Sequence, residues 1–162
     1  MKILVAVASR HGSTLEIADA LARELGTAGH IVDVQTLEDS PAVEGYDAAV
    51  IGSAVYMGKW LPQAEQFVDR HQAQLAAMPV WLFSSGPLGS DDPQPKGEPA
   101  HLDQLIGRTG ARGHRTFVGK LDKGELGIGE RLIARAVGAR LRKRHNCGAR
   151  FGATSGRLGT NE

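Results

Sequence analysis

Six consecutive residues near the start of the chain combine hydroxyl groups, two basic side chains and a glycine. An apolar run at residues 3–8 leads into them, and apolar residues at helical spacing follow from Ile17. A strand that passes directly into a helix brings free amides and the positive end of the helix dipole to this turn, where a phosphate can bind. The residues of this predicted phosphate site are Ser9, Arg10, His11, Gly12, Ser13 and Thr14.

In this predicted site the hydroxyl groups act as neutral donors, Gly12 lets the backbone approach the anion, and Arg10 adds charge. His11 is a weaker candidate, because a side chain at such a turn can point to solvent. The alternative is that Ser13 only caps the helix, with Glu16 completing a capping box, and that the rest is a polar turn.

Two further loops follow predicted strands. The stretch GSAVYMGKW covers residues 52–60, and SSGPLG covers residues 84–89. Because the carboxyl ends of parallel strands share one edge of a sheet, we expect all three loops to form one cleft. Tyr56 and Trp60 would bring aromatic surface to a planar ring there, the alternative being that they pack against the neighbouring helix.

Competing catalytic motifs are absent from the sequence. There is no G-x-G-x-x-G, no phosphate-loop G-x-x-x-x-G-K, no G-x-S-x-G elbow, and no H-E-x-x-H or cysteine pair for zinc. Ser84 has no obvious histidine and acid partners, so serine catalysis is not expected. The scattered histidines His101, His114 and His145 are expected at the surface. The sequence therefore indicates no catalytic side chain and no metal ligand.

Charge is distributed unevenly along the 162 residues. The net charge is +1, but residues 139–162 hold six basic residues and one acidic residue, so this segment carries +5 and the rest −4. The mildly acidic body gives no electrostatic reason to expect nucleic acid as a partner. With one cysteine and an apolar start too short for most signal peptides, the chain is expected to be cytoplasmic.

Alternating strand and helix patterns predict an α/β fold with a parallel sheet covered on both faces. Helices are predicted from residue 13 or 14 to about 26–29 and from about 59 to 78, and a long loop at 86–99. One domain is expected over residues 1–144, followed by a disordered, basic, Gly-rich tail at 145–162. The predicted strands cover residues 3–8, 31–34, 48–53, 80–84 and 114–118, the second and fifth at the edges.

The stretch ASRHGST resembles the phosphate-binding loop of flavodoxin-like proteins. YDAAVIGSAVYMGKWLPQAEQFVDRH more specifically resembles flavodoxin-domain proteins of the menaquinone-dependent protoporphyrinogen dehydrogenase type. The resemblance runs from residue 1 to about 138 and includes GHRTFVGKLDKGELGIGERLIARAVG. Members of this family usually end in an amphipathic helix that covers the sheet, whereas the sequence here shows no helical apolar stripe beyond Leu141.

The resemblance implies a flavodoxin-like three-layer sandwich with a five-stranded parallel sheet in the order 2-1-3-4-5. It also implies noncovalent FMN, with the phosphate on residues 9–14 and the isoalloxazine between two loops. The ring-side residues are Ser53, Ala54, Val55, Tyr56, Met57, Gly58, Ser84, Ser85, Gly86, Pro87, Leu88 and Gly89.

Three functions stay open on the sequence. The first is an FMN-dependent oxidoreductase that takes electrons from a small-molecule substrate of porphyrinogen type and passes them to a quinone. The second is an electron carrier that docks on a redox partner protein, and the third is a protein that binds a hydroxy-deazaflavin coenzyme instead of FMN. A basic amphipathic helix at residues 128–143 could hold the protein at the inner membrane surface, the alternative being that it covers the sheet. The sequence fixes neither the electron donor and acceptor nor the oligomeric state.

Overall fold

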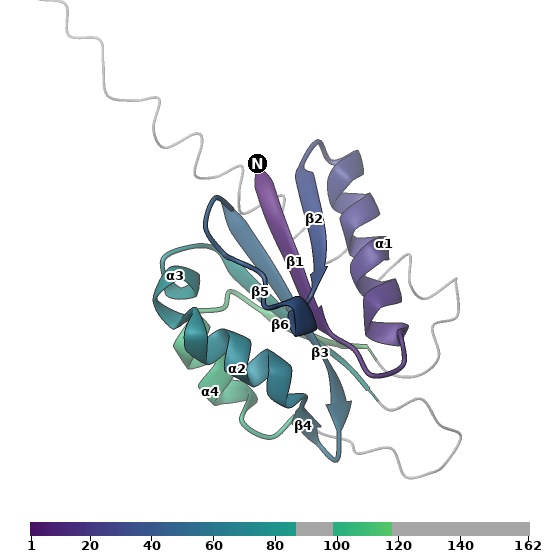
Figure 1. Cartoon of the computed structure of the whole chain (residues 1–162), viewed down its shortest axis with the longest axis vertical. Coiled ribbons are helices and arrows are strands. Elements are labelled where there is room, and N and C mark those ends of the chain that lie inside the picture. The colour runs from purple at the N-terminus through teal and green to yellow at the C-terminus, as the bar shows by residue number, and fades with distance from the viewer. Residues whose placement is uncertain (87–98, 118–162) are drawn as a thin grey trace, which may run out of the picture.

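A computed structural model describes residues 1–86 and 99–117 of the chain. The tail predicted at 145–162, the helix predicted at 128–143 and most of the loop predicted at 86–99 lie outside these residues. Within them, a central sheet is flanked by helices (Figure 1).

Five parallel strands form the sheet in the path β2-β1-β3-β5-β6. Counted without the short β4, this is the predicted order 2-1-3-4-5, which is therefore confirmed together with the edge positions of β2 and β6. The strands are β1 (Lys2–Ala8), β2 (Ile31–Thr36), β3 (Ala48–Tyr56), β5 (Val80–Ser85) and β6 (His114–Phe117).

Helices cover both faces of the sheet, which confirms the three-layer arrangement (Figure 1). On one face, α1 (Ser13–Thr27) packs Ile17, Leu21 and Leu25 against alternate residues of β1, β3 and β5. On the other face lie α2 (Pro62–Arg70), α3 (Gln72–Ala76), α4 (Leu102–Thr109) and the short 3-10 helix η1 (Leu37–Asp39). The inner strands are apolar on both sides because both sides are buried.

The helix predicted over residues 59–78 is wrong at its start and in its middle. Lys59 and Trp60 form β4, which pairs antiparallel with the end of β3. Met57 and Gly58 form the two-residue turn between these strands, with φ angles of 50° and 75°, as in the turns favoured in tight hairpins. His71 then interrupts the helical stretch with φ −110° and ψ 18°, so that α2 and α3 are separate.

A glycine in the middle of the sheet makes room for an aromatic ring. Gly52 of β3 pairs with Phe83 of β5, and a Cβ at position 52 would lie 2.1 Å from Phe83 Cζ. Phe83 is fully buried and meets the Phe117 ring edge to face, with centroids 5.8 Å apart. The absence of a side chain at position 52 therefore fixes where the Phe83 ring can lie.

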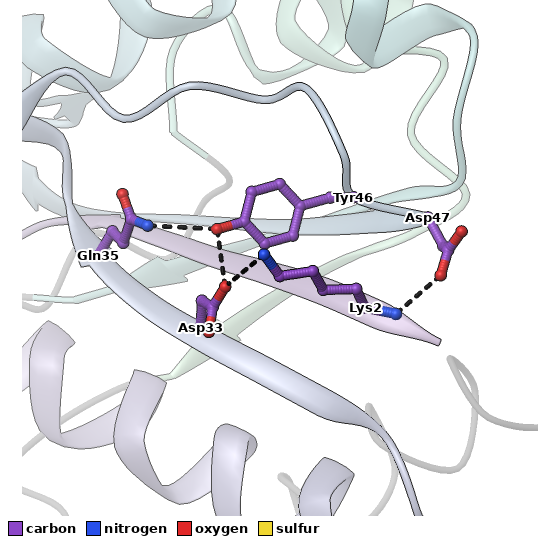
Figure 2. Close-up of polar contacts among 5 residues, drawn as sticks. All are labelled: Lys2, Asp33, Gln35, Tyr46 and Asp47. Atoms are coloured by element: carbon purple, nitrogen blue, oxygen red, sulfur yellow. Dashed lines mark hydrogen bonds and ion pairs between the residues drawn. The ribbon is translucent and has the colours of Figure 1, made fainter.

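Polar side chains join the outer strand β2 to β1 and to the loop before β3 (Figure 2). Tyr46 donates a 2.9 Å hydrogen bond to Asp33, and Lys2 Nζ lies 3.2 Å from the same carboxylate oxygen. Gln35 donates to the Tyr46 hydroxyl, and Asp47 accepts from the backbone amide of Lys2. The Tyr46 hydrogen bond and then Lys2 lower the pKa of Asp33, while burial and then Asp33 raise that of Tyr46.

Candidate functional site

A pocket of about 210 Å³ lies where the first loop, the end of β3 and the end of β5 meet. The three loops that the sequence predicted to share a cleft are thus brought together at the carboxyl edge of the sheet, where open α/β sheets bind ligands. The residues lining the pocket are Arg10, His11, Ser13, Ala54, Val55, Tyr56, Leu61, Ser85 and Gly86.

The first loop is shaped by Gly12 rather than by a capping box. Gly12 takes the N-cap position of α1 with φ 86°, a left-handed conformation that favours glycine. Ser9 Oγ accepts a 3.0 Å hydrogen bond from the Gly12 amide. The capping box expected from Ser13 and Glu16 is wrong: α1 begins at Ser13 itself, and its N-cap makes no side-chain hydrogen bond.

Thr14 has a buried hydroxyl without a hydrogen-bond partner among the described residues. It lies in the first turn of α1, where backbone amides lack intrahelical acceptors. A buried hydroxyl left unpaired costs about 1–3 kcal/mol. This atom is therefore suited to an acceptor that arrives with a ligand.

Two residues of the second loop are strongly exposed, and one of them meets the first loop. Tyr56 is 57% exposed, and the Arg10 guanidinium lies over its ring, 4.6 Å from the centroid. Such a cation–π contact joins the two walls of the pocket. Met57 is 87% exposed at the hairpin tip, and the Gly58 carbonyl accepts a 2.7 Å hydrogen bond from the Ala100 amide.

Trp60 does not lie beside Tyr56 in the cleft. It is only 3% exposed and belongs to the core on the α2 and α4 face, so the alternative of packing against the helices is the correct one. Its indole nitrogen donates a 2.8 Å hydrogen bond to Ser84 Oγ. The next residue, Leu61, lines the pocket and donates its amide to Ser53 Oγ at 2.9 Å.

The third loop is described up to Gly86, and the predicted Pro87, Leu88 and Gly89 lie outside the described residues. Ser85 and Gly86 line the pocket, whereas Ser84 is fully buried behind it. Ser84 Oγ lies 2.8 Å from His114 Nε2.

His114 is therefore half-buried and hydrogen-bonded, rather than the open surface residue that the sequence predicted. Burial lowers its pKa to about 4, so the imidazole is neutral at neutral pH. Sequence reasoning also missed Leu61, which it counted among the helical apolar residues, although Pro62 after it marked the helix start. His114 offered no local signal, because its partner Ser84 is 30 residues away.

The described residues include neither a membrane-spanning helix nor a cluster of metal ligands. No helix in residues 1–86 and 99–117 is long and apolar enough to cross a bilayer. Across the same ranges, no three His, Cys, Asp or Glu side chains gather as metal ligands would.

The fold and the position of the pocket define the class: a parallel α/β protein of flavodoxin type. The chain belongs to the flavodoxin domain family, whose model matches residues 4–146. Among solved structures it is similar to a flavodoxin from the domain Archaea, with a TM-score of 0.68 and 20% identity over 88% of this chain and 99% of that one. It is also similar to oxidised flavodoxin 1 from Bacillus cereus, with a TM-score of 0.65 and 20% identity over 88% of this chain and 98% of that one. These likenesses support the fold.

One curated relative has a higher sequence identity to the chain than these structures do, but the match covers less of both proteins. Over 87 residues the chain is 36% identical to protoporphyrinogen IX dehydrogenase (quinone) of Escherichia coli. The match covers 52% of this chain and 48% of that protein, so it spans about half of the relative's length.

Proposed function

We propose that the pocket binds FMN noncovalently and that the protein is an FMN-dependent oxidoreductase. The observation that carries the cofactor proposal is the unpartnered, buried hydroxyl of Thr14. A phosphate oxygen at the N-terminus of α1 would accept a hydrogen bond from it and from free amides of the first turn. Ser13, which lines the pocket, and Ser9 would add hydroxyl donors. The donor set is neutral and suited to a phosphate monoester.

The ring of FMN would lie against the other two loops. Bound FMN would supply the redox chemistry, and the protein would orient it and exclude water. Val55, Tyr56 and Leu61 offer apolar surface on one wall, and Ser85 and Gly86 offer small residues on the other. Met57 and Gly58, at the hairpin tip, would complete the ring side.

The proposed reaction takes electrons from a reduced small molecule of porphyrinogen type and delivers them to a quinone. The 36% identity to protoporphyrinogen IX dehydrogenase (quinone) supports this substrate class, whereas the flavodoxin structures support the fold alone. Quinone reduction would bring the protein to a membrane surface. Anaerobic mixing of the FMN-loaded protein with a porphyrinogen should reduce the flavin, and a soluble quinone should reoxidise it. Lack of reduction would leave an electron carrier as the function.

The cofactor proposal is tested by Thr14→Val, which keeps the shape of the side chain and removes its hydroxyl. Because this hydroxyl has no partner among the described residues of the unliganded protein, the variant should be as stable as wild type or slightly more so. A hydrogen bond to a charged group contributes about 1.5–3 kcal/mol, so FMN affinity should fall at least about tenfold.

Two controls make the FMN titration specific. Riboflavin, which lacks the phosphate, should bind wild type and Thr14→Val equally. Thr109→Val removes another fully buried hydroxyl, one that bonds to the Leu105 carbonyl in α4, and should leave FMN affinity unchanged. Equal FMN affinity of Thr14→Val and wild type would refute the phosphate assignment. Binding of hydroxy-deazaflavin but not FMN would refute the cofactor assignment.

A further inference from the structure

A chain of two linked hydrogen bonds joins β4, β5 and β6 next to residues that line the pocket. The indole Nε1 of Trp60 in β4 lies 2.8 Å from Ser84 Oγ at the end of β5. The same Ser84 oxygen lies 2.8 Å from His114 Nε2 at the start of β6. None of the three residues lines the pocket. Leu61, which follows Trp60 in the sequence, and Ser85, which follows Ser84, both line it. Trp60 and Ser84 are thus sequence neighbours of residues on two walls of the pocket.

The donors and acceptors of this chain can be arranged in one self-consistent direction. An indole N–H can only donate, so Ser84 Oγ accepts from Trp60. The Ser84 proton is then available to His114, whose neutral ring presents a lone pair on Nε2 when Nδ1 carries the proton. Trp60 and Ser84 are 3% and 0% exposed, so water is kept from the bond between them, whereas the bond to the partly exposed His114 is only part-buried.

A second serine strengthens the same attachment. Ser53 of β3 is the register partner of Ser84, and its Oγ accepts the amide of Leu61 at 2.9 Å. Two neighbouring hydroxyls thus hold two consecutive residues, Trp60 and Leu61, against the sheet. Val55 pairs with Trp60, so this attachment helps to set the position of the hairpin of residues 55–60, together with the Gly58–Ala100 hydrogen bond and the contact of Arg10 with Tyr56.

We propose that Ser84 and His114 are positioning residues for the flavin: through Trp60 they hold the hairpin wall at the distance that the isoalloxazine ring requires. The identity of the ligand as FMN rests on the proposed function. The role of these residues in placing the hairpin does not depend on it. Loss of the chain would let residues 55–60 move away from Ser85 and Gly86, and the ring between them would be held less tightly.

The test uses three variants, Ser84→Ala, His114→Leu and His114→Gln. Thr109→Val is the control. Leucine leaves the Ser84 proton without an acceptor, whereas the glutamine carbonyl can accept it. Ser84→Ala and His114→Leu should each weaken FMN binding about tenfold, the equivalent of about 1.4 kcal/mol. They should also shift the midpoint potential of bound FMN, and His114→Gln should restore both properties toward wild type.

Amide hydrogen exchange in the unliganded protein supplies a readout that needs no flavin. Ser84→Ala and His114→Leu should speed exchange at residues 55–61 about tenfold relative to α1, as expected when a local contact opens more often. Thr109→Val should lower the melting temperature without changing exchange at the hairpin, FMN affinity or potential.

The outcomes separate the two proposals. If Ser84→Ala and His114→Leu only lower the melting temperature, as Thr109→Val does, the hydrogen-bonded chain is purely structural and the positioning role is overturned. If wild type binds no FMN, the proposed function fails. In that case amide exchange at residues 55–61 still tests the positioning of the hairpin. Slow exchange in Ser84→Ala would overturn the positioning role, and faster exchange would support it.

Discussion

Replacing Gly52 by alanine should destabilise the sheet next to the site. The new Cβ would lie 2.1–2.6 Å from three atoms of the Phe83 ring. Carbon atoms in favourable contact are about 3.5 Å apart or more, so the ring would have to retreat by about 1.4 Å. Phe83 is fully buried and already packs on Phe117, so a movement of the ring would disturb its packing in the core.

The expected net loss of stability is about 2–3 kcal/mol. Overpacking in a close-packed core costs about 1–3 kcal/mol, and a forced movement of this size belongs at the upper end. Alanine at position 52 recovers up to about 1 kcal/mol by restricting the unfolded chain, which offsets only part of the loss. Urea unfolding of the unliganded protein measures the change. Gly107→Ala is the matched control, because a Cβ there meets no described atom within 4 Å beyond its chain neighbours and its own helix backbone, and α4 should gain up to about 1 kcal/mol.

A double-mutant cycle tests whether Phe83 causes the loss. Phe83→Leu alone should destabilise by removing buried surface, but in the Gly52→Ala background it should restore stability by relieving the overlap. The coupling energy should exceed about 1 kcal/mol. Additive effects, or a Gly52→Ala protein within about 0.5 kcal/mol of wild type, would refute the steric argument.

Met57→Asn should stabilise the hairpin by about 0.5–1 kcal/mol in urea unfolding, because Asn before Gly58 tolerates the φ of 50° better than Met does; a lower urea midpoint would contradict this. Tyr46 holds the pKa of Asp33 below its usual 3.8, so the stability from this carboxylate is present above that pH and is lost as the pH falls through the lower folded value. Asp33→Asn should therefore flatten the acid side of the stability profile, and an unchanged profile would exclude this role. His114 has a pKa of about 4 when folded against 6.5 unfolded, so stability should fall as the pH drops between these values. The loss should be about 1–2 kcal/mol after allowance for the partial exposure of the ring, and it should vanish in His114→Gln.

Much of the fold was accessible from the sequence, because burial on both faces gives continuous apolar strands. The runs at β1, β3 and β5 are of this kind, and their order follows from the family resemblance. The hairpin was missed because Leu61 fits the helical period of the residues after it. The turn at Met57 and Gly58 depends on two positive φ angles. Of the two residue types, only glycine indicates such a conformation in the sequence.

The site was accessible as three loops but not as a hydrogen-bond network. Residue types and strand ends were enough to bring Ser13, Tyr56 and Ser85 to one pocket. Whether a hydroxyl is paired depends on distant segments, so neither the free hydroxyl of Thr14 nor the bond between Ser84 and His114 has a local signature.

The polar cluster around Asp33 also bears on how the molecule avoids unwanted association. Among the described residues, β2 pairs with β1 alone, so its outer edge could template another strand. Asp33, with Lys2 and Tyr46, places a charged, hydrogen-bonded group in the middle of this outer strand. An apolar strand added beside it would have to desolvate that charge or break its bonds. A charged group of this kind on an edge strand disfavours edge-to-edge pairing, and this one lies at the side of the sheet away from β5 and β6.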